Sequence, residues 1–307
     1  MNHDRIHAAI PLAAALAVAL FTSGCSLQRM AVNRIGDSLA AGGGTFASDD
    51  DPELVREATP FSLKLIESLL EQVPRHRGLL LAASRGFTQY AYGFLQQEAD
   101  YREETDYAAS RALRERARKL YLRAHGYGMR GLALDHRDFA AAFGRDPEAA
   151  LATLKRKDLD LLYWTGISWM AAISLAKDDP EQVAQIPQAE AMLRRAFALD
   201  ENYGEGALHQ FYITYGARPE EMGGSPAEAR EHFQRAVELT GGQSAGPYVA
   251  LAESVALPEQ NRPEFEELLH QALAIDVDRK PEYRLMNLLM QERARWLLAQ
   301  ADLLFVP

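Results

Sequence analysis

The sequence predicts an all-α protein that follows a lipoprotein signal peptide. Apolar residues recur at three- and four-residue steps along most of the chain, as residues 113–124 illustrate. No run of alternating β-branched residues bounded by turn residues is found, so strands are not expected. Helix starts are marked where proline follows a residue that commonly caps a helix, because proline fits the first helical position. These starts are Asp51-Pro52, Asp146-Pro147, Asp179-Pro180 and Ser225-Pro226.

The first 24 residues have the features of a secretion signal. The apolar run 8–21 is shorter than the roughly 20 residues that span a bilayer, but it suits the hydrophobic region of a signal peptide. Ser23 and Gly24 precede Cys25, the only cysteine, and this order resembles a bacterial lipobox in which Thr22 replaces the usual leucine. We therefore expect Cys25 to be the lipidated N-terminus of the mature protein. Ser26 rather than Asp follows it, which favours the outer membrane as destination.

The rest of the chain has the composition of one or two globular domains. The whole chain of 307 residues, signal segment included, is 48% hydrophobic and 25% charged. The formal net charge is −10, which argues against nucleic-acid binding because phosphates require a basic surface. One cysteine excludes an intrachain disulfide framework and a thiolate-rich metal site. We expect a tether with a first helix over residues 25–49 and a helical domain over residues 50–307.

A repeat is predicted within the helical domain. Tetratricopeptide units place a small, a large and a small residue at steps of four and three, because their paired helices pack closely. Three starts, at residues 189, 229 and 265, are 40 and 36 residues apart, near the period of about 34. Stacked units would form a solenoid with a concave face. The triads are Ala117/Tyr121/Ala124, Ala189/Leu193/Ala196 and Ala229/Phe233/Ala236, with partial matches at Phe265/Leu269/Ala272 and Ser62/Ile66/Leu69.

Several local strings resemble a known family. Residues 32–40 (VNRIGDSLA), 46–55 (FASDDDPELV), 86–92 (GFTQYAY) and 222–226 (MGGSP) are similar to the T-component family of tripartite ATP-independent periplasmic (TRAP) transporters. The resemblance implies a periplasmic helical lipoprotein with tetratricopeptide-like repeats that forms homotrimers. It also implies association with the substrate-binding P-component. The family has no established catalytic motif, so we expect neither an enzyme nor a cofactor.

Aromatic residues are the candidate ligand-binding residues. Because buried Tyr and Trp need partners for their O–H and N–H groups, they often border polar cavities. Two interpretations stay open, packing of the core and lining of an apolar ligand groove. The residues are Tyr163, Trp164 and Trp169 on a buried helix over 161–176, and Tyr203, Phe211, Tyr212 and Tyr215 on another helix.

His209 is a further candidate. Glu205, His209 and Tyr212 are spaced four and three residues apart, so on one helix they would share a face. A carboxylate that orients an imidazole is the geometry of a general base, and it is also an ordinary helical pair beside a tyrosine. The six histidines beyond the signal peptide never occur at metal-ligand spacing, so no metal is expected.

Three other motifs have a simpler structural interpretation. The patterns G-x-G-x-x-G at 126–131 and G-x-S-x-G at 242–246 match nucleotide-binding and nucleophile motifs, but both motifs require a preceding strand and here a helix is predicted. We expect close helix approach or a turn at 126–131, and a helix C-cap with a loop at 241–246. The basic run 111–123 favours a solvated face, with docking of an acidic partner or of lipid headgroups as the alternative.

Three functions are therefore compared. The resemblance favours an accessory subunit of a TRAP-type transport system. A repeat-containing lipoprotein that scaffolds outer-membrane or pilus assembly would have the same architecture. A periplasmic hydrolase using Glu205 and His209 would also need a nucleophile and oxyanion donors, and the sequence offers only that one pair.

The expected lipidation of Cys25 can be tested directly. Replacing Cys25 with Ser removes the thiol that accepts the lipid, so Cys25→Ser should move the protein from the membrane fraction to the soluble fraction. The measurement is immunoblotting of fractions after ultracentrifugation. A variant that still sediments with membranes would show that Cys25 is not the anchor.

Overall fold

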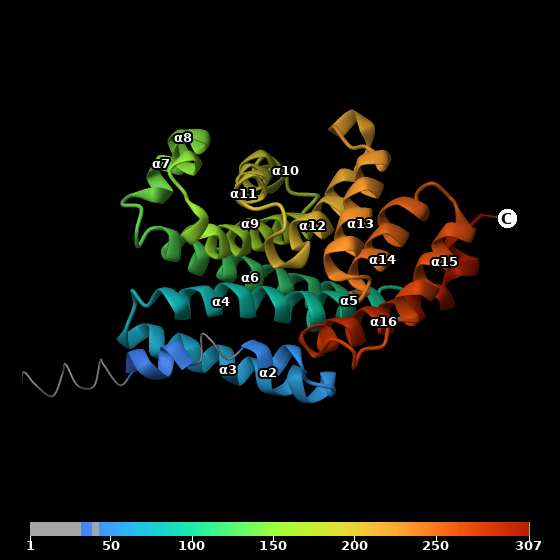
Figure 1. Cartoon of the computed structure of the whole chain (residues 1–307), viewed down its shortest axis with the longest axis horizontal. Coiled ribbons are helices and arrows are strands. Elements are labelled where there is room, and N and C mark those ends of the chain that lie inside the picture. The colour runs from blue at the N-terminus through green and yellow to red at the C-terminus, as the bar shows by residue number, and fades with distance from the viewer. Residues whose placement is uncertain (1–31, 39–42, 307) are drawn as a thin grey trace, which may run out of the picture.

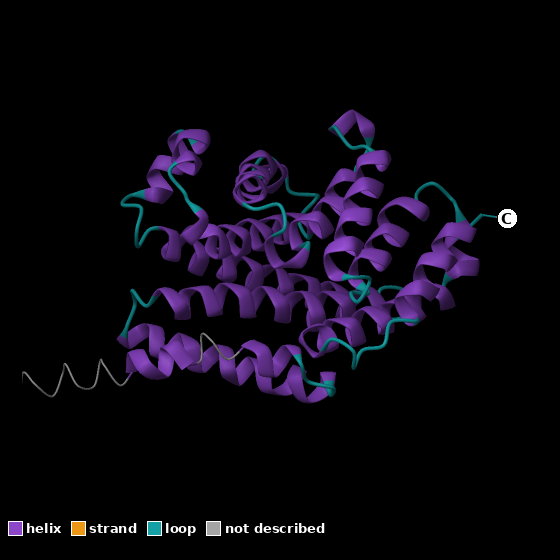
Figure 2. Ribbon diagram, in the orientation of Figure 1, coloured by secondary structure: helices purple, strands orange, loops and turns teal. Residues whose placement is uncertain are grey.

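The protein is built of helices joined by loops. The computed structural model describes residues 32–38 and 43–306, and this part of the chain contains no strand (Figure 2). The all-α prediction is confirmed. Cys25 and the signal segment lie outside the described residues. Within those residues, no helix combines the length and apolar character needed to cross a membrane.

The N-terminal helices form two layers. The long helix α3 begins after Asp51, whose carboxylate accepts the backbone N–H groups of Glu53 and Leu54 at 3.1 and 3.0 Å. It packs against α4, which continues through the π-helical turn η1 into α5, as Figure 1 shows. The helices are α2 (Gly43–Ala47), α3 (Pro52–Gln72), α4 (Arg77–Tyr90), η1 (Ala91–Gln96) and α5 (Gln97–Arg102).

The central layer is helix α6 (Tyr107–Leu132), with α4 on one side and α9 (Leu159–Ser174) on the other. Its buried residues Ser110, Ala117, Ala124 and Gly131 recur every seven positions, so a narrow stripe of small side chains faces the neighbours. A Cβ atom on Gly128 would collide with the Thr165 side chain. The 126–131 motif therefore lies in the C-terminal part of α6 in close contact with another helix, which is the first of the two expected alternatives.

A second apolar cluster lies beyond α9. It is formed largely by α9 and α11, and one edge is fixed by the fully buried Asp158. This carboxylate accepts the backbone N–H of Lys155 at 3.0 Å and contacts His136 Nε2 at 3.0 Å and Arg77 Nη2 at 3.3 Å. The elements are α7 (Phe139–Arg145), α8 (Pro147–Ala152), η2 (Arg156–Asp158), α10 (Pro180–Val183) and α11 (Ile186–Leu199).

The C-terminal helices return to the N-terminal layers. Successive helices α12 to α16 pack in order, and α16 also contacts α2 and α3 (Figure 1). The elements are η3 (Tyr203–Glu205), α12 (Ala207–Gly216), η4 (Glu220–Met222), α13 (Pro226–Thr240), α14 (Gly246–Leu251), η5 (Ala252–Ala256), α15 (Arg262–Leu273), η6 (Pro281–Tyr283), α16 (Arg284–Ala299) and α17 (Ala301–Leu304).

A half-buried ion network joins the two ends of this arrangement. Arg293 on α16 donates from Nη1 to Asp100 on α5 at 3.1 Å, and from Nε and Nη2 to Glu253 on η5 at 2.8 and 2.7 Å. Asp100 also accepts from Arg114 of α6 at 3.0 Å. The network connects residues that are 193 positions apart in the sequence.

The structure tests the predicted helix starts and shows how far the residues of the repeat triads are buried. Asp51, Asp146, Asp179 and Ser225 all cap helices through their side chains, which confirms the four starts. The residues of the three full triads are buried except Phe233, which is half-buried against the core. The tetratricopeptide-like solenoid itself stays a prediction.

The α6–α9 contact predicts opposite effects for two alanine substitutions. Gly128→Ala should lower the free energy of unfolding by about 1–3 kcal/mol, because the added methyl group displaces Thr165. Gly126→Ala is the matched control on the same helix, where an added Cβ meets no atom within 4 Å, and it should raise stability by up to about 1 kcal/mol. Urea denaturation measures both. Equal effects of the two substitutions would contradict the close contact.

Candidate functional site

The predicted aromatic residues fall into three separate groups rather than into the lining of one groove. In the first group the Tyr163 ring lies 5.1 Å from that of Trp164 and 4.9 Å from that of Tyr203. Tyr203 lies on η3 and not on the helix of Tyr212, contrary to expectation. Its hydroxyl donates to Asp160 Oδ1 at 2.7 Å. This group therefore links α9 to the short turn before α12.

Trp169 forms the second group. Its ring lies 4.7 Å from His125 and 6.2 Å from Phe143, and its indole N–H donates to Gln185 at 3.0 Å. Burial lowers the pKa of His125, so this imidazole is neutral near pH 7. Since Trp169 is buried and its polar atom has a partner, its contacts are those of a core residue.

The third group surrounds His209 on α12. Tyr212 and Tyr215 lie on the same helix, with their ring centroids 6.4 Å apart. Tyr215 donates its hydroxyl to Glu190 at 2.8 Å. Burial raises the pKa of Tyr212 and of Tyr215 to about 12, so both hydroxyls keep their protons at neutral pH.

The expected pairing of Glu205 with His209 is wrong. Glu205 lies on η3 with a φ of 52°, and its carboxylate accepts from the Lys280 ammonium group. Gly206, with a φ of 101°, separates this turn from α12, so the two residues do not share one helix face. The general-base geometry is therefore not formed.

His209 instead pairs with a histidine of the next helix. Its Nδ1 lies 2.9 Å from Nδ1 of His232 on α13. One nitrogen must donate and the other must accept, so the contact requires a neutral acceptor imidazole. Burial, together with the nearby His232, lowers the pKa of His209 to about 4. The described residues contain no group of three or more His, Cys, Asp or Glu side chains arranged to hold a metal ion.

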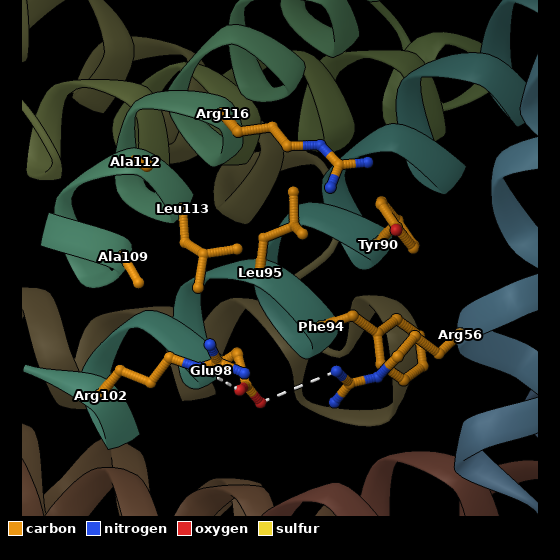
Figure 3. A pocket seen from close by; sticks show the side chains of 10 residues that line it. All are labelled: Arg56, Tyr90, Phe94, Leu95, Glu98, Arg102, Ala109, Ala112, Leu113 and Arg116. Carbon is orange, nitrogen blue, oxygen red and sulfur yellow. Dashed lines mark hydrogen bonds and ion pairs between the residues drawn. The ribbon is translucent and has the colours of Figure 1, made fainter. Parts of the chain in front are cut away.

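A cavity of about 410 Å³ that is open to solvent lies elsewhere, between α3, the α4–η1–α5 segment and α6 (Figure 3). None of the predicted aromatic residues lines it. Its lining combines apolar side chains with three arginines and one glutamate. The residues are Arg56, Tyr90, Phe94, Leu95, Glu98, Arg102, Ala109, Ala112, Leu113 and Arg116.

The charges of this cavity are only partly paired. Glu98 binds Arg102 through a hydrogen bond and lies 3.7 Å from Arg56 Nη1. The Arg56 guanidinium also stacks over the Phe94 ring, 5.6 Å from its centroid. Arg116 makes no ion pair with any residue that the structure describes. No sequence pattern pointed to Arg56. Arg116 belongs to the basic run 111–123, which was expected to form a solvated face.

Three of the six basic residues in that run form ion pairs within the chain. Arg114 binds Asp100 and Glu103, Lys119 lies 3.2 Å from Glu115, and Arg123 lies 3.4 Å from Glu67. The Arg114–Asp100 and Arg123–Glu67 pairs connect α6 to α5 and α3, whereas the Lys119–Glu115 pair lies within α6. Arg116 is exposed, as predicted for a solvated face, makes no ion pair within the described residues and borders the pocket.

The histidine pair predicts a pH dependence of stability. Unfolded histidines titrate near pH 6.5 and native His209 near 4, so between these values the unfolded state binds protons that the native state does not. The free energy of unfolding should therefore fall by about 2 kcal/mol as the pH drops from 6.5 to 4.

The double variant His209→Gln/His232→Gln should have a flatter profile in urea denaturation across this pH range. His270→Gln is the control, because His270 is an exposed histidine on α15. A wild-type slope in the double variant would show that other groups cause the acid sensitivity.

Comparison with known proteins identifies the family. A family model described as the TRAP transporter T-component matches residues 48–305. A protein of Treponema pallidum (strain Nichols) that bears the name "Uncharacterized protein" is 33% identical over 311 aligned positions, which cover 95% of this chain and 96% of the relative. The match extends over nearly all described helices, from α3 to α17. The chain belongs to the TRAP transporter T-component family.

Proposed function

We propose that the protein is a lipid-anchored periplasmic accessory subunit that binds the substrate-binding P-component of a TRAP-type transport system. The family match over residues 48–305 carries this proposal. The family is one of transporter components and is not a known enzyme family. The lipobox-like order before Cys25 supports anchoring, and Ser26 supports the outer membrane.

The proposed docking must be reversible. Contacts between transport partners must release as well as form, so a micromolar dissociation constant is expected, equivalent to about 8 kcal/mol. A homotrimer, as the family resemblance implies, would present three such surfaces in one assembly.

Two of the aromatic groups are the proposed ligand contacts of this subunit. Trp164 is half-buried, and its indole N–H has no hydrogen-bond partner within the described part of the chain. Tyr163 and Tyr203 pack beside it, and His209, Tyr212 and Tyr215 form the group on α12. An apolar ligand with an acceptor group would match an aromatic surface that carries an unused donor.

Partner binding is tested by a pull-down. The full-length Cys25→Ser chain serves as bait, and the prey is the solute-binding protein encoded beside it or, failing a neighbour, periplasmic extract. Retention with a dissociation constant of about 1–10 μM is expected. If no solute-binding protein is retained at roughly 100 μM, the transport proposal fails. Recovery of pilus or outer-membrane assembly factors instead would favour the scaffolding alternative.

The ligand role of the aromatic surface is tested by Trp164→Ala. Transfer of a ligand from the partner should slow by about tenfold, because truncating a large aromatic contact removes roughly 1.4 kcal/mol or more. Tyr107→Ala is the control, since Tyr107 is an exposed aromatic residue at the start of α6. If transfer is unchanged while the partner still binds, Trp164 is a packing residue only.

A further inference from the structure

The cavity between α3 and α6 contains two hydrogen-bond donors without partners. The hydroxyl of Tyr90 makes no hydrogen bond with the residues that the structure describes, although its ring packs 5.7 Å from that of Phe94. Arg116 likewise has no ion pair within the described ranges. Figure 3 shows its side chain extended from α6 toward the side of the cavity where Tyr90 lies.

The charge of the cavity is positive. Glu98 supplies the single carboxylate of the lining, and Arg56, Arg102 and Arg116 supply three guanidinium groups. Arg56 and Arg102 both contact Glu98, so Arg116 is the guanidinium left for a bound group. A local positive charge is notable in a chain whose net charge is −10. A planar guanidinium fork matches the two oxygens of a carboxylate, so this lining favours anions and disfavours cations.

The remaining wall of the cavity is apolar. Phe94 and Leu95 are buried, and Leu113, Ala109 and Ala112 of α6 face them across the cavity. The volume of about 410 Å³ lies at the lower end of the range found for small-molecule sites. A ligand that fits must be small and must have an apolar body beside its charged group.

The π-helical turn η1 explains why these residues line one cavity. Tyr90, Phe94, Glu98 and Arg102 are spaced four residues apart. On a regular α-helix each such step rotates the side chain by about 40°, so three steps would turn Arg102 well away from Tyr90. The wider turn at Ala91–Gln96 offsets this rotation. Such π-helical insertions occur frequently at functional sites.

We propose that this cavity binds a small amphipathic carboxylate. Arg116 and the Tyr90 hydroxyl bind the carboxylate group, and Phe94, Leu95 and Leu113 contact the apolar body. Arg56 lies beside the charged group but is held by Glu98 and Phe94. This site goes beyond the proposed transport role, because it shares no residue with the aromatic groups and does not depend on a partner protein.

The test uses octanoate and benzoate as probes of the full-length Cys25→Ser chain in isothermal titration calorimetry. Octanol has the apolar body of octanoate without the charge, and octylammonium has the opposite charge. At least one carboxylate should bind in the micromolar to low millimolar range, and both controls should bind at least tenfold more weakly. If neither carboxylate binds at about 10 mM, or if octanol binds as tightly as octanoate, the proposal is overturned.

Variants assign the binding to this cavity. Arg116→Ala should weaken carboxylate binding at least tenfold, and Tyr90→Phe should weaken it several-fold, because each removes one donor. Arg111→Ala is the matched control, since Arg111 is an exposed arginine on the same helix that does not line the cavity. Circular dichroism checks that each variant is folded. If Arg116→Ala and Arg111→Ala have the same affinity as the parent, the site is not this cavity.

Carboxylate binding by the cavity can be confirmed or contradicted independently of the transport proposal. Arg116→Ala should still retain the solute-binding protein in the pull-down, because partner docking does not require the cavity. Loss of carboxylate binding with retained partner binding therefore supports the cavity site. Carboxylate binding without any retained partner supports the site and contradicts only the transport role.

Discussion

The close approach of α4 and α9 to α6 is the constraint on which the other contacts depend. One stripe of α6 has only small residues, so the neighbouring helices pack close to its backbone. These residues are Ser110, Ala117, Ala124 and Gly131. The two apolar clusters of the protein meet along this helix, because Tyr121 belongs to one cluster and Leu132 to the other. Larger side chains here would separate both clusters at once, since close-packed interiors have few voids to absorb added volume.

Long-range charge pairing adds specificity to this packing. The half-buried Arg293 guanidinium contacts Glu253 and Asp100, and these two carboxylates raise its pKa although burial opposes the charge. Removing one partner of such a network leaves a charge without its counter-ion away from water, and this lowers the free energy of unfolding. Asp100 lies on α5, the helix that also carries Glu98 and Arg102 of the cavity. The C-terminal helices therefore help to hold one wall of a cavity formed by N-terminal residues.

Two chemically different surfaces result. The groups on α9, η3 and α12 are aromatic, and their tyrosine hydroxyls remain protonated because burial raises their pKa values. The cavity beside α3 is smaller and positively charged, with donors that the described residues leave unused. The chain belongs to the TRAP transporter T-component family, and the partner and ligand roles proposed above would use these two surfaces.

The sequence by itself determined the all-α class and the four capped helix starts. These features depend on backbone hydrogen bonds within one turn, which neighbouring residues in the chain control. Similarity of local strings also sufficed for the family. Only the tertiary structure decided that Lys280 binds Glu205, that His232 pairs with His209, and that the aromatic residues form separate groups. It also brought Arg56, Tyr90 and Arg116 together from three helices, because side-chain neighbours between helices depend on crossing geometry that no local pattern specifies.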